Sequence, residues 1–262
     1  PGGTNAITGV LGAWTDSIPM IIISGQIRTE TIGAGKNGLR QLGDQEINII
    51  DIVKPITKYS VTIMEPYDIK YHLDKAFFIA KTGRPGPVWL DIPLNIQGAY
   101  IEEKKLRKFD SSEIKPQYIT SSDRIKELTL KTIDRLKKSK RPVLLVGNGV
   151  RLAGASSEIL KLIDLLKVPT LASFTGYDLI STDNKYSFGR PGTVGQRAAN
   201  FILQNSDLLI VLGSRLNIRA IGYNFDLFTR AAYKIIIDID KAELEKKTIR
   251  PEEYDSRKAT FL

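Results

Sequence analysis

The sequence predicts an α/β protein made of two domains, each with a parallel sheet covered by helices. Short apolar runs of strand length, such as Pro19–Ser24 and Pro87–Ile92, alternate with longer stretches whose apolar residues recur at helical spacing. A polar stretch without a regular pattern separates two such series. We therefore expect a first domain over 1–94, a linker over 95–121 and a second domain over 122–262.

The first 26 residues combine a glycine turn, a helix start and a strand. Thr4 or Asn5 can cap the helix, because a short side-chain oxygen there accepts a bond from a free N–H of the first turn. Such a helix start can hold an anion, and the residues that we expect around it are Pro1, Gly2 and Asn5. One face of the helix has small residues that let another backbone or a flat ligand approach, namely Ala6, Gly9, Gly12 and Ala13. Tight packing of the helix on the strand explains the same glycines without a ligand.

The rest of the first domain alternates between loop, helix and strand. The strand at Pro19–Ser24 ends at Gly25-Gln26, where α/β sheets place ligand loops. The glycine-rich stretch that follows, up to Asp44, reads as a long loop, and long loops in compact domains are usually functional. We then expect a helix over 45–53 ended by Pro55, a strand over 57–63, a helix over 66–81 and a strand over 87–92.

The second domain shows the same alternation. We expect helices over 122–139, 155–166 and 193–205, and strands over 141–146, 169–173, 207–212 and 233–239. Gly147-Asn148-Gly149 lies between a strand and a helix, but a dinucleotide fingerprint fails at its third glycine, where Leu152 stands. Gly192 and Thr193 open a later helix, whose free N–H groups favour a phosphate. Ordinary capping by Thr193 is the alternative.

Composition excludes several function classes. The 262 residues carry a net charge of +9, yet the basic residues of Asp123–Arg141 alternate with apolar ones at helical spacing and lack aromatic residues to stack bases. No apolar run approaches the roughly 20 residues that cross a bilayer. We therefore expect neither nucleic acid nor a membrane as a partner. Cysteine is absent, which fits a cytoplasmic protein, and His72 is the single histidine. We expect no metal ligands in this chain and an ordinary surface or boundary role for His72.

Several stretches resemble one enzyme family. The segment PGGTNAITG, with AWTDSIPM and IISGQ after it, resembles the pyrimidine-binding domain of thiamine-diphosphate enzymes, in particular the acetolactate synthase-like group. Gln45-Glu46 and KPITK resemble the family's FQE and RPIxK stretches, although Asp44 replaces the aromatic residue. The stretch from GRPGTVGQ to GSRLNIR resembles the family's central, Rossmann-like domain. The resemblance implies that this chain is a fragment covering part of the first of these domains and most of the second.

The resemblance also implies roles for individual residues. Gln45 would lie beside thiamine diphosphate and the substrate, and Arg219 would recognise the carboxylate of a second substrate. A planar guanidinium suits a 2-oxo acid, but an exposed arginine that pairs with a neighbouring acid is the plain alternative. Cofactor contacts are expected from Pro1, Gly2, Asn5, Gln26, Lys54, Gly192, Thr193, Arg215 and Asp238. Lys54 stands where the family has a flavin-contacting arginine, and Arg190 where it has a methionine. Asp238 and Asp240 end a strand, so they can also be helix caps.

The implied activity is the condensation of two 2-oxo acids, with decarboxylation of pyruvate and transfer of the two-carbon unit. It implies thiamine diphosphate and Mg²⁺, with FAD as a further cofactor, and a homodimer or homotetramer as the intact protein. The family's catalytic glutamate and metal motif would lie outside this chain, so we expect the fragment alone to be inactive. The alternatives are another thiamine-diphosphate lyase or transferase, such as a 2-oxo acid decarboxylase or a sulfoacetaldehyde acetyltransferase-like enzyme, and a non-catalytic α/β nucleotide-binding module.

Overall fold

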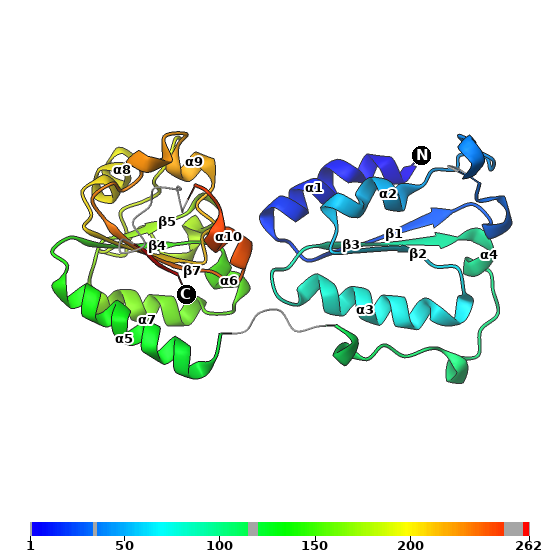
Figure 1. Cartoon of the computed structure of the whole chain (residues 1–262), viewed down its shortest axis with the longest axis horizontal. Coiled ribbons are helices and arrows are strands. Elements are labelled where there is room, and N and C mark those ends of the chain that lie inside the picture. Colours follow the sequence, from blue (N-terminus) through cyan, green and yellow to red (C-terminus); the bar gives the residue numbers. More distant parts are fainter. Residues whose placement is uncertain (1, 34–35, 115–119, 249–258, 262) are drawn as a thin grey trace. The chain divides into compact units, whose positions relative to one another are not determined.

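The computed structural model describes residues 2–33, 36–114, 120–248 and 259–261. The chain divides into two compact units, Pro1–Gln117 and Tyr118–Leu262. Each unit is a parallel sheet with helices on both faces (Figure 1). The predicted α/β class with two parallel sheets is thereby confirmed.

The sheet of the first unit has three parallel strands in the order β1-β3-β2. The strands are β1 (Met20–Gln26), β2 (Tyr59–Thr62) and β3 (Pro87–Pro93). The helices are α1 (Ile7–Asp16), α2 (Ile49–Val53), α3 (Ile69–Lys81) and α4 (Leu94–Gln97). Helices α1 and α2 cover one face of the sheet and α3 covers the other (Figure 1). Trp89 of the central strand is fully buried under α1 and α2.

The start of α1 differs from the expectation. Residues Gly2–Ala6 form a 3₁₀ helix, η1, and Ala6 occupies the N-cap position of α1 without a side-chain capping bond. Val10 and Ala13 of α1 are buried against the sheet. Gly9 and Gly12 are exposed, and no described atom lies within 4 Å of where their Cβ would be. Within the described part of the chain, no other backbone therefore approaches Gly9 or Gly12, whereas Ala13 packs on the sheet.

The helix expected over 45–53 is shorter in the structure. It begins only at Ile49, because Gln45 has a left-handed backbone with a φ of 59° and Asn48 caps α2 by accepting from the Asp51 N–H. Pro55 does not end the helical conformation abruptly. It lies in a 3₁₀ turn, Lys54–Ile56, which leads to β2.

A segment after β3 packs on α3 in the first unit. The guanidinium of Arg107 lies 3.8 Å from the ring centre of Tyr71, whose hydroxyl donates to Glu113 at 2.6 Å. Phe109 contacts the rings of both Tyr71 and Phe78. These residues fall within the stretch that the sequence suggests as a linker, so part of that stretch is an element of the first unit.

The sheet of the second unit has the order β5-β4-β6-β7-β8, all parallel. The strands are β4 (Pro142–Val146), β5 (Thr170–Ala172), β6 (Leu208–Leu212), β7 (Tyr233–Ile237) and β8 (Ala259–Phe261). The helices are α5 (Ser122–Lys138), α6 (Gly149–Leu152), α7 (Ser156–Leu166), α8 (Arg197–Gln204), α9 (Ile218–Ile221) and α10 (Lys241–Glu245). Helices α5 and α7 cover one face, and α8 and α9 cover the other (Figure 1).

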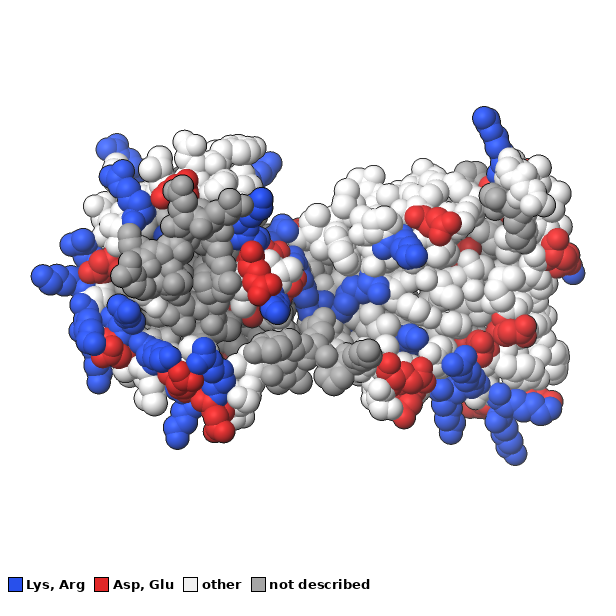
Figure 2. Space-filling view, viewed as in Figure 1, with Lys and Arg blue, Asp and Glu red and all other residues white. Residues whose placement is uncertain are grey.

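Positive and negative side chains are interspersed over the face of the molecule that Figure 2 shows. On α5, Glu127 pairs with both Arg124 and Lys131, and Asp134 pairs with Lys138. These three cations are more than half or about half exposed, as on the solvated helix face that the spacing predicts, and each has an acid as its partner. Among the described residues, no helix combines the length and the apolar character needed to span a bilayer.

Candidate functional site

The predicted site residues form two sets, one in each unit, and each set has its own geometry. In the first unit, Gln45 is exposed at the end of the loop that follows β1. Its φ of 59° places a residue with a Cβ in the left-handed region, which residues other than glycine, asparagine and aspartate rarely adopt. Residues held in such conformations need a surrounding structure that fixes them.

Glu46 provides part of that support. Its side chain is 7% exposed, and its carboxylate accepts from the backbone N–H groups of Gly33, Leu42 and Gly43 at 2.6, 2.8 and 3.1 Å. The loop also packs on itself, because a Cβ at Gly43 would come within 2.1 Å of the Ile27 side chain. Gly33, whose Cβ would lie 2.8 Å from the Leu42 side chain, and Gly43 therefore serve the compact folding of the loop around one buried carboxylate. Sequence reasoning did not identify Glu46 as its centre.

Gln26 ends β1 and is fully engaged inside the protein. Its amide nitrogen donates to the Asp91 carboxylate at 3.0 Å and to the Ile47 carbonyl at 2.9 Å. Its amide oxygen accepts from the Ile27 N–H at 3.0 Å. The amide predicted to touch a cofactor thus ties three segments of the first unit together.

The remaining predicted residues of the first unit lie at the surface. Gly2 and Asn5 are exposed in η1, and a Cβ at Gly2 would meet open space. Lys54 is exposed at the end of α2. Pro1, which belongs to the same predicted set, lies outside the described residues. Within the described residues, Gln45, Asn5 and Lys54 make no side-chain hydrogen bond or ion pair, so these polar groups are available to a ligand.

The second unit places its predicted residues at the carboxyl edge of the sheet. Chain order reverses between β4 and β6, because β5 lies on one side of β4 and β6 on the other. Ligands of open α/β sheets bind at such switch points. Here the turn after β4, Gly147-Asn148-Gly149, packs directly on Gly213 after β6, and the Gly149 N–H donates to the Gly213 carbonyl at 2.9 Å.

This packing explains the glycines without a ligand. A Cβ at Gly147 would lie 2.1 Å from the Gly213 oxygen, and one at Gly149 would lie 2.7 Å from the Gly213 Cα. Only glycine lets the two turns touch. The glycines after β4 therefore allow close contact between two loops at the edge of the sheet, the turn after β4 and the turn after β6.

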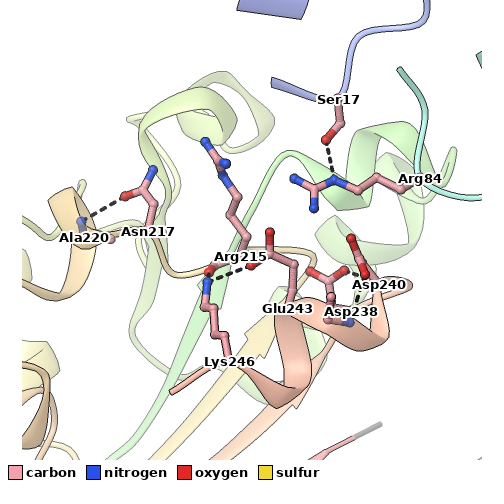
Figure 3. Close-up of polar contacts among 10 residues, drawn as sticks. Ser17, Arg84, Arg215, Asn217, Ala220, Asp238, Asp240, Glu243 and Lys246 are labelled. Atoms are coloured by element: carbon pink, nitrogen blue, oxygen red, sulfur yellow. Dashed lines mark hydrogen bonds and ion pairs between the residues drawn. The ribbon is translucent and has the colours of Figure 1, made fainter. Parts of the chain in front are cut away.

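Arg215 lies two residues after Gly213, and its backbone carbonyl is hydrogen-bonded. Lys246 donates to the Arg215 carbonyl and pairs with Glu243 at 2.7 Å (Figure 3). The side chain of Arg215 extends away from Lys246 (Figure 3) and has no hydrogen-bond or ion-pair partner among the described residues. Asp240 caps α10 by accepting from the Ala242 N–H, and Asp238 accepts from the Asp240 N–H, each at 2.9 Å. The capping role considered for these strand-end acids is thus confirmed for Asp240.

Gly192 and Thr193 do not open a helix, because α8 begins at Arg197. The Gly192 N–H donates to the Asn200 side chain at 2.8 Å. The N–H and the hydroxyl of Thr193 both donate to the Arg219 carbonyl, each at 2.9 Å. The expectation of a phosphate cradle made of free N–H groups at a helix start is therefore wrong for these two residues, and so is capping by Thr193.

Arg219 is exposed on the short helix α9, which Asn217 caps through the Ala220 N–H. The structure shows no ion pair for Arg219 within the residues it describes. The alternative, in which Arg219 pairs with a neighbouring acid at the surface, is therefore not found among the described residues. A guanidinium without a partner can receive a carboxylate in bidentate geometry.

Arg190 lies beside two exposed rings in the second unit. Its guanidinium is 5.7 Å from the ring centre of Phe174 and 5.4 Å from that of Tyr177, within the range of cation–π contacts. Both rings belong to η8 (Phe174–Leu179), which follows β5. Gly176 of η8 packs on the turn after β4, since its Cβ would come within 3.1 Å of the Gly147 carbonyl carbon. Sequence reasoning did not identify this group of a guanidinium and two rings.

His72 fits the boundary role that its helix predicts. Its Nδ1 lies 2.6 Å from the Tyr59 hydroxyl, and its ring stacks on Tyr59 and meets the edge of Tyr71. Burial lowers the pKa of His72, and burial raises the pKa of Tyr59 to about 12. Groups of three or more metal-ligating side chains are not found among the described residues.

Comparison with known proteins identifies the family. Residues 1–51 match the thiamine pyrophosphate enzyme N-terminal TPP binding domain, and residues 130–252 match the thiamine pyrophosphate enzyme central domain.

Similar curated proteins include a probable acetolactate synthase large subunit of Methanocaldococcus jannaschii, 36% identical over 94% of this chain and 40% of that protein. An acetolactate synthase large subunit of Cyanidium caldarium is 36% identical over 95% of this chain and 41% of its own length. The acetolactate synthase isozyme 1 large subunit of Escherichia coli is 35% identical over 94% of this chain and 41% of its own length. The chain thus spans about two fifths of these relatives, and it belongs to the thiamine pyrophosphate enzymes.

Proposed function

We propose that the full-length protein condenses two 2-oxo acids with thiamine diphosphate, as the name acetolactate synthase describes for its relatives. The observation that carries this proposal is the similarity to acetolactate synthase large subunits, which runs through both units and covers 94% of the chain. Gln45 and Arg219 are exposed, and their side chains have no partner among the described residues. This supports the proposal, because these are the two positions expected to meet substrate.

In this proposal each unit has a separate task. The side-chain amide of Gln45 orients the reacting 2-oxo acid, with its left-handed backbone fixed by the loop around Glu46. The guanidinium of Arg219 binds the carboxylate of the second 2-oxo acid through paired N–H groups. Thiamine diphosphate, when bound, supplies the electron sink for decarboxylation. The exposed η1 residues Gly2 and Asn5 fit a contact with that cofactor, whereas Gln26 fits a positioning role.

Mg²⁺ and FAD belong to the same proposal as further cofactors. The metal would be held by residues beyond this chain. For FAD, the guanidinium of Arg215 at the switch-point edge, which has no partner within the described ranges, suits an anionic group, and Asp238 at the end of β7 suits a ribose. Lys54, which is exposed at the end of α2, completes the proposed cofactor set. Visible absorption of the purified full-length protein, before and after reconstitution with FAD, tests this part of the proposal. A flavin-free protein with full activity would refute it.

The activity itself is tested with the purified full-length protein, pyruvate, thiamine diphosphate and Mg²⁺. We expect release of CO₂ together with formation of acetolactate. CO₂ release without acetolactate would instead indicate a 2-oxo acid decarboxylase, and turnover of sulfoacetaldehyde would indicate an acetyltransferase of the kind considered above. Nucleotide binding without any turnover would support a non-catalytic module and overturn the proposal.

Assembly and location are part of the proposal as well. A homodimer or homotetramer is expected, and sedimentation of the full-length protein measures its size. The cytoplasm as the place of the reaction stays a prediction.

A further inference from the structure

A row of polar side chains crosses the otherwise apolar sheet of the first unit. Asp91 on the central strand β3 lies between Ser24 on β1 and Thr62 on β2 in the strand register. Asp91 is 1% exposed, and one carboxylate oxygen, Oδ1, accepts from the Ser24 hydroxyl at 2.6 Å. Ser24 in turn accepts from the Trp89 indole N–H at 2.7 Å. Burying a carboxyl inside a sheet is costly unless it is hydrogen-bonded, so this group needs its partners.

The other carboxylate oxygen of Asp91 fixes the orientation of the Gln26 amide. Oδ2 accepts from the Gln26 amide nitrogen at 3.0 Å and from Thr62 at 3.4 Å. Because a carboxylate oxygen can only accept from this amide, the NH₂ group of Gln26 must face Asp91. The same NH₂ group then donates to the Ile47 carbonyl at 2.9 Å. Asp91 thereby determines which end of Gln26 meets the chain at Ile47.

Ile47 lies two residues after Gln45, whose φ of 59° requires external support. Glu46 between them holds the opposite side of the loop through three backbone N–H groups. Two buried acids, Asp91 and Glu46, thus hold the segment of Gln45 from two sides. The pKa of Asp91 is raised because burial outweighs the hydrogen bonds from Ser24, Gln26 and Thr62, and each of these donors favours the ionised form that accepts from Gln26.

We propose that Asp91 is a positioning residue for Gln45, acting through the Gln26 amide and the Ile47 carbonyl. This inference rests on the proposed function, in which Gln45 meets the substrate. Asp91 itself touches no reacting atom. Its contribution is to keep the loop that ends at Gln45 in one conformation.

The first test measures amide hydrogen exchange over residues 41–49 in the full-length protein, which requires neither substrate nor cofactor. In Asp91→Asn, the acceptor that faces Gln26 becomes either a neutral amide oxygen or an NH₂ group, so the charge-assisted bond from Gln26 is weakened or lost. We expect exchange in this segment to become at least about tenfold faster, as for loss of a hydrogen bond to a charged group. Ser24→Ala is the matched control. It removes a donor to Oδ1 and leaves the Gln26 link intact, and it should keep the native protection of 41–49.

The double variant Gln26→Glu/Asp91→Asn separates positioning from general stability. The pair at 26 and 91 is restored with donor and acceptor exchanged, so the melting temperature should recover. A glutamate cannot donate to the Ile47 carbonyl, so exchange over 41–49 should stay fast. If Asp91→Asn does not fold, Gln26→Met removes the same link to Ile47 from the strand end. Native protection in Asp91→Asn or Gln26→Met, or full protection in the double variant, would overturn the inference.

The second test is kinetic. In the full-length protein with cofactors, Asp91→Asn should lower kcat at least about tenfold with little change in KM for pyruvate, because binding groups remain while Gln45 is displaced. Faster exchange with unchanged kcat would show that Asp91 fixes the loop but has no effect on catalysis, which would overturn its role as a positioning residue. If the wild-type protein lacks activity on 2-oxo acids, the proposed function fails, whereas the exchange result still decides whether Asp91 fixes the loop.

Discussion

Thr193 donates twice to the carbonyl oxygen of Arg219, once from its backbone N–H and once from its hydroxyl, each at 2.9 Å. The two residues are 26 positions apart, so a loop before α8 fixes the short helix that carries Arg219. Gly192 stands beside this contact with a φ of 112°, and its Cβ would come within 2.5 Å of the same oxygen. The neighbouring loop leaves no room there for a side chain.

From this contact we predict the effect of Thr193→Val. The substitution keeps the N–H bond and removes the hydroxyl bond, a loss of about 1 kcal/mol or about fivefold. In the full-length protein we expect KM for the second 2-oxo acid to rise by up to that factor, with decarboxylation of pyruvate unchanged. Thr129→Val is the matched control, since its hydroxyl donates to a carbonyl within α5 at 2.8 Å. Equal effects of both substitutions would contradict the prediction.

Arg219→Ala should have a larger and more selective effect. Removing a guanidinium that binds a carboxylate costs at least about tenfold in use of the second 2-oxo acid. Pyruvate decarboxylation should change much less, and the two reactions are measured separately as product formation and CO₂ release. Arg124→Ala on α5 removes an exposed arginine that pairs with Glu127, and it should alter neither. Equal loss of both reactions, or of neither, would remove the role that we assign to Arg219.

Gln45 allows backbone and side-chain effects to be separated. Glycine tolerates a φ of 59° without the cost of roughly 1 kcal/mol that a Cβ brings there. Gln45→Gly should therefore leave the melting temperature of the full-length protein equal or higher, whereas Gln45→Ala should not raise it. Both variants lack the amide and should lose most of the activity. Full activity in Gln45→Gly would show that the amide has no part in the reaction.

Hydrophobic periodicity was sufficient to predict most strands and helices of both sheets, because each buried run or apolar helix face depends on local sequence. It failed where distant contacts decide the backbone. The helix expected from Thr193 begins instead at Arg197, and the N–H and the hydroxyl of Thr193 donate to the Arg219 carbonyl, 26 residues later in the chain. The helix expected from Gln45 begins at Ile49 because of the left-handed backbone at Gln45.

The residues expected to meet substrate could be predicted from the sequence, whereas the buried hydrogen bonds that hold them in place could not. Gln45 and Arg219 were identifiable by resemblance, and the structure leaves both side chains unpaired among the described residues. Sequence reasoning missed Asp91, although an acid within an apolar strand is a signal for buried hydrogen-bond partners. Those partners, Ser24 and Gln26, lie more than 60 residues earlier in the chain. Spacing along the sequence cannot reveal such a pair.

The last prediction concerns the pH dependence of stability through His72. Burial, its largest influence, lowers the pKa of His72 below the ordinary value of 6.5, and Lys75 and Arg107 lower it further, whereas Asp68 raises it. Below pH 6.5 the unfolded chain then binds more protons at this site than the folded one. The free energy of unfolding should therefore fall as pH drops from 6.5 to the lowered pKa, and this contribution should be constant above about pH 7.

The test compares melting temperatures of the full-length protein between pH 5 and pH 8. His72→Gln removes the titrating ring and should flatten the decline at low pH. In Tyr59→Phe the decline should persist, because the ring of His72 stays stacked and half-buried although its 2.6 Å partner is gone. Since burial and not the hydroxyl is the main cause of the lowered pKa, a flat profile in Tyr59→Phe would assign the pH dependence to the hydrogen bond instead.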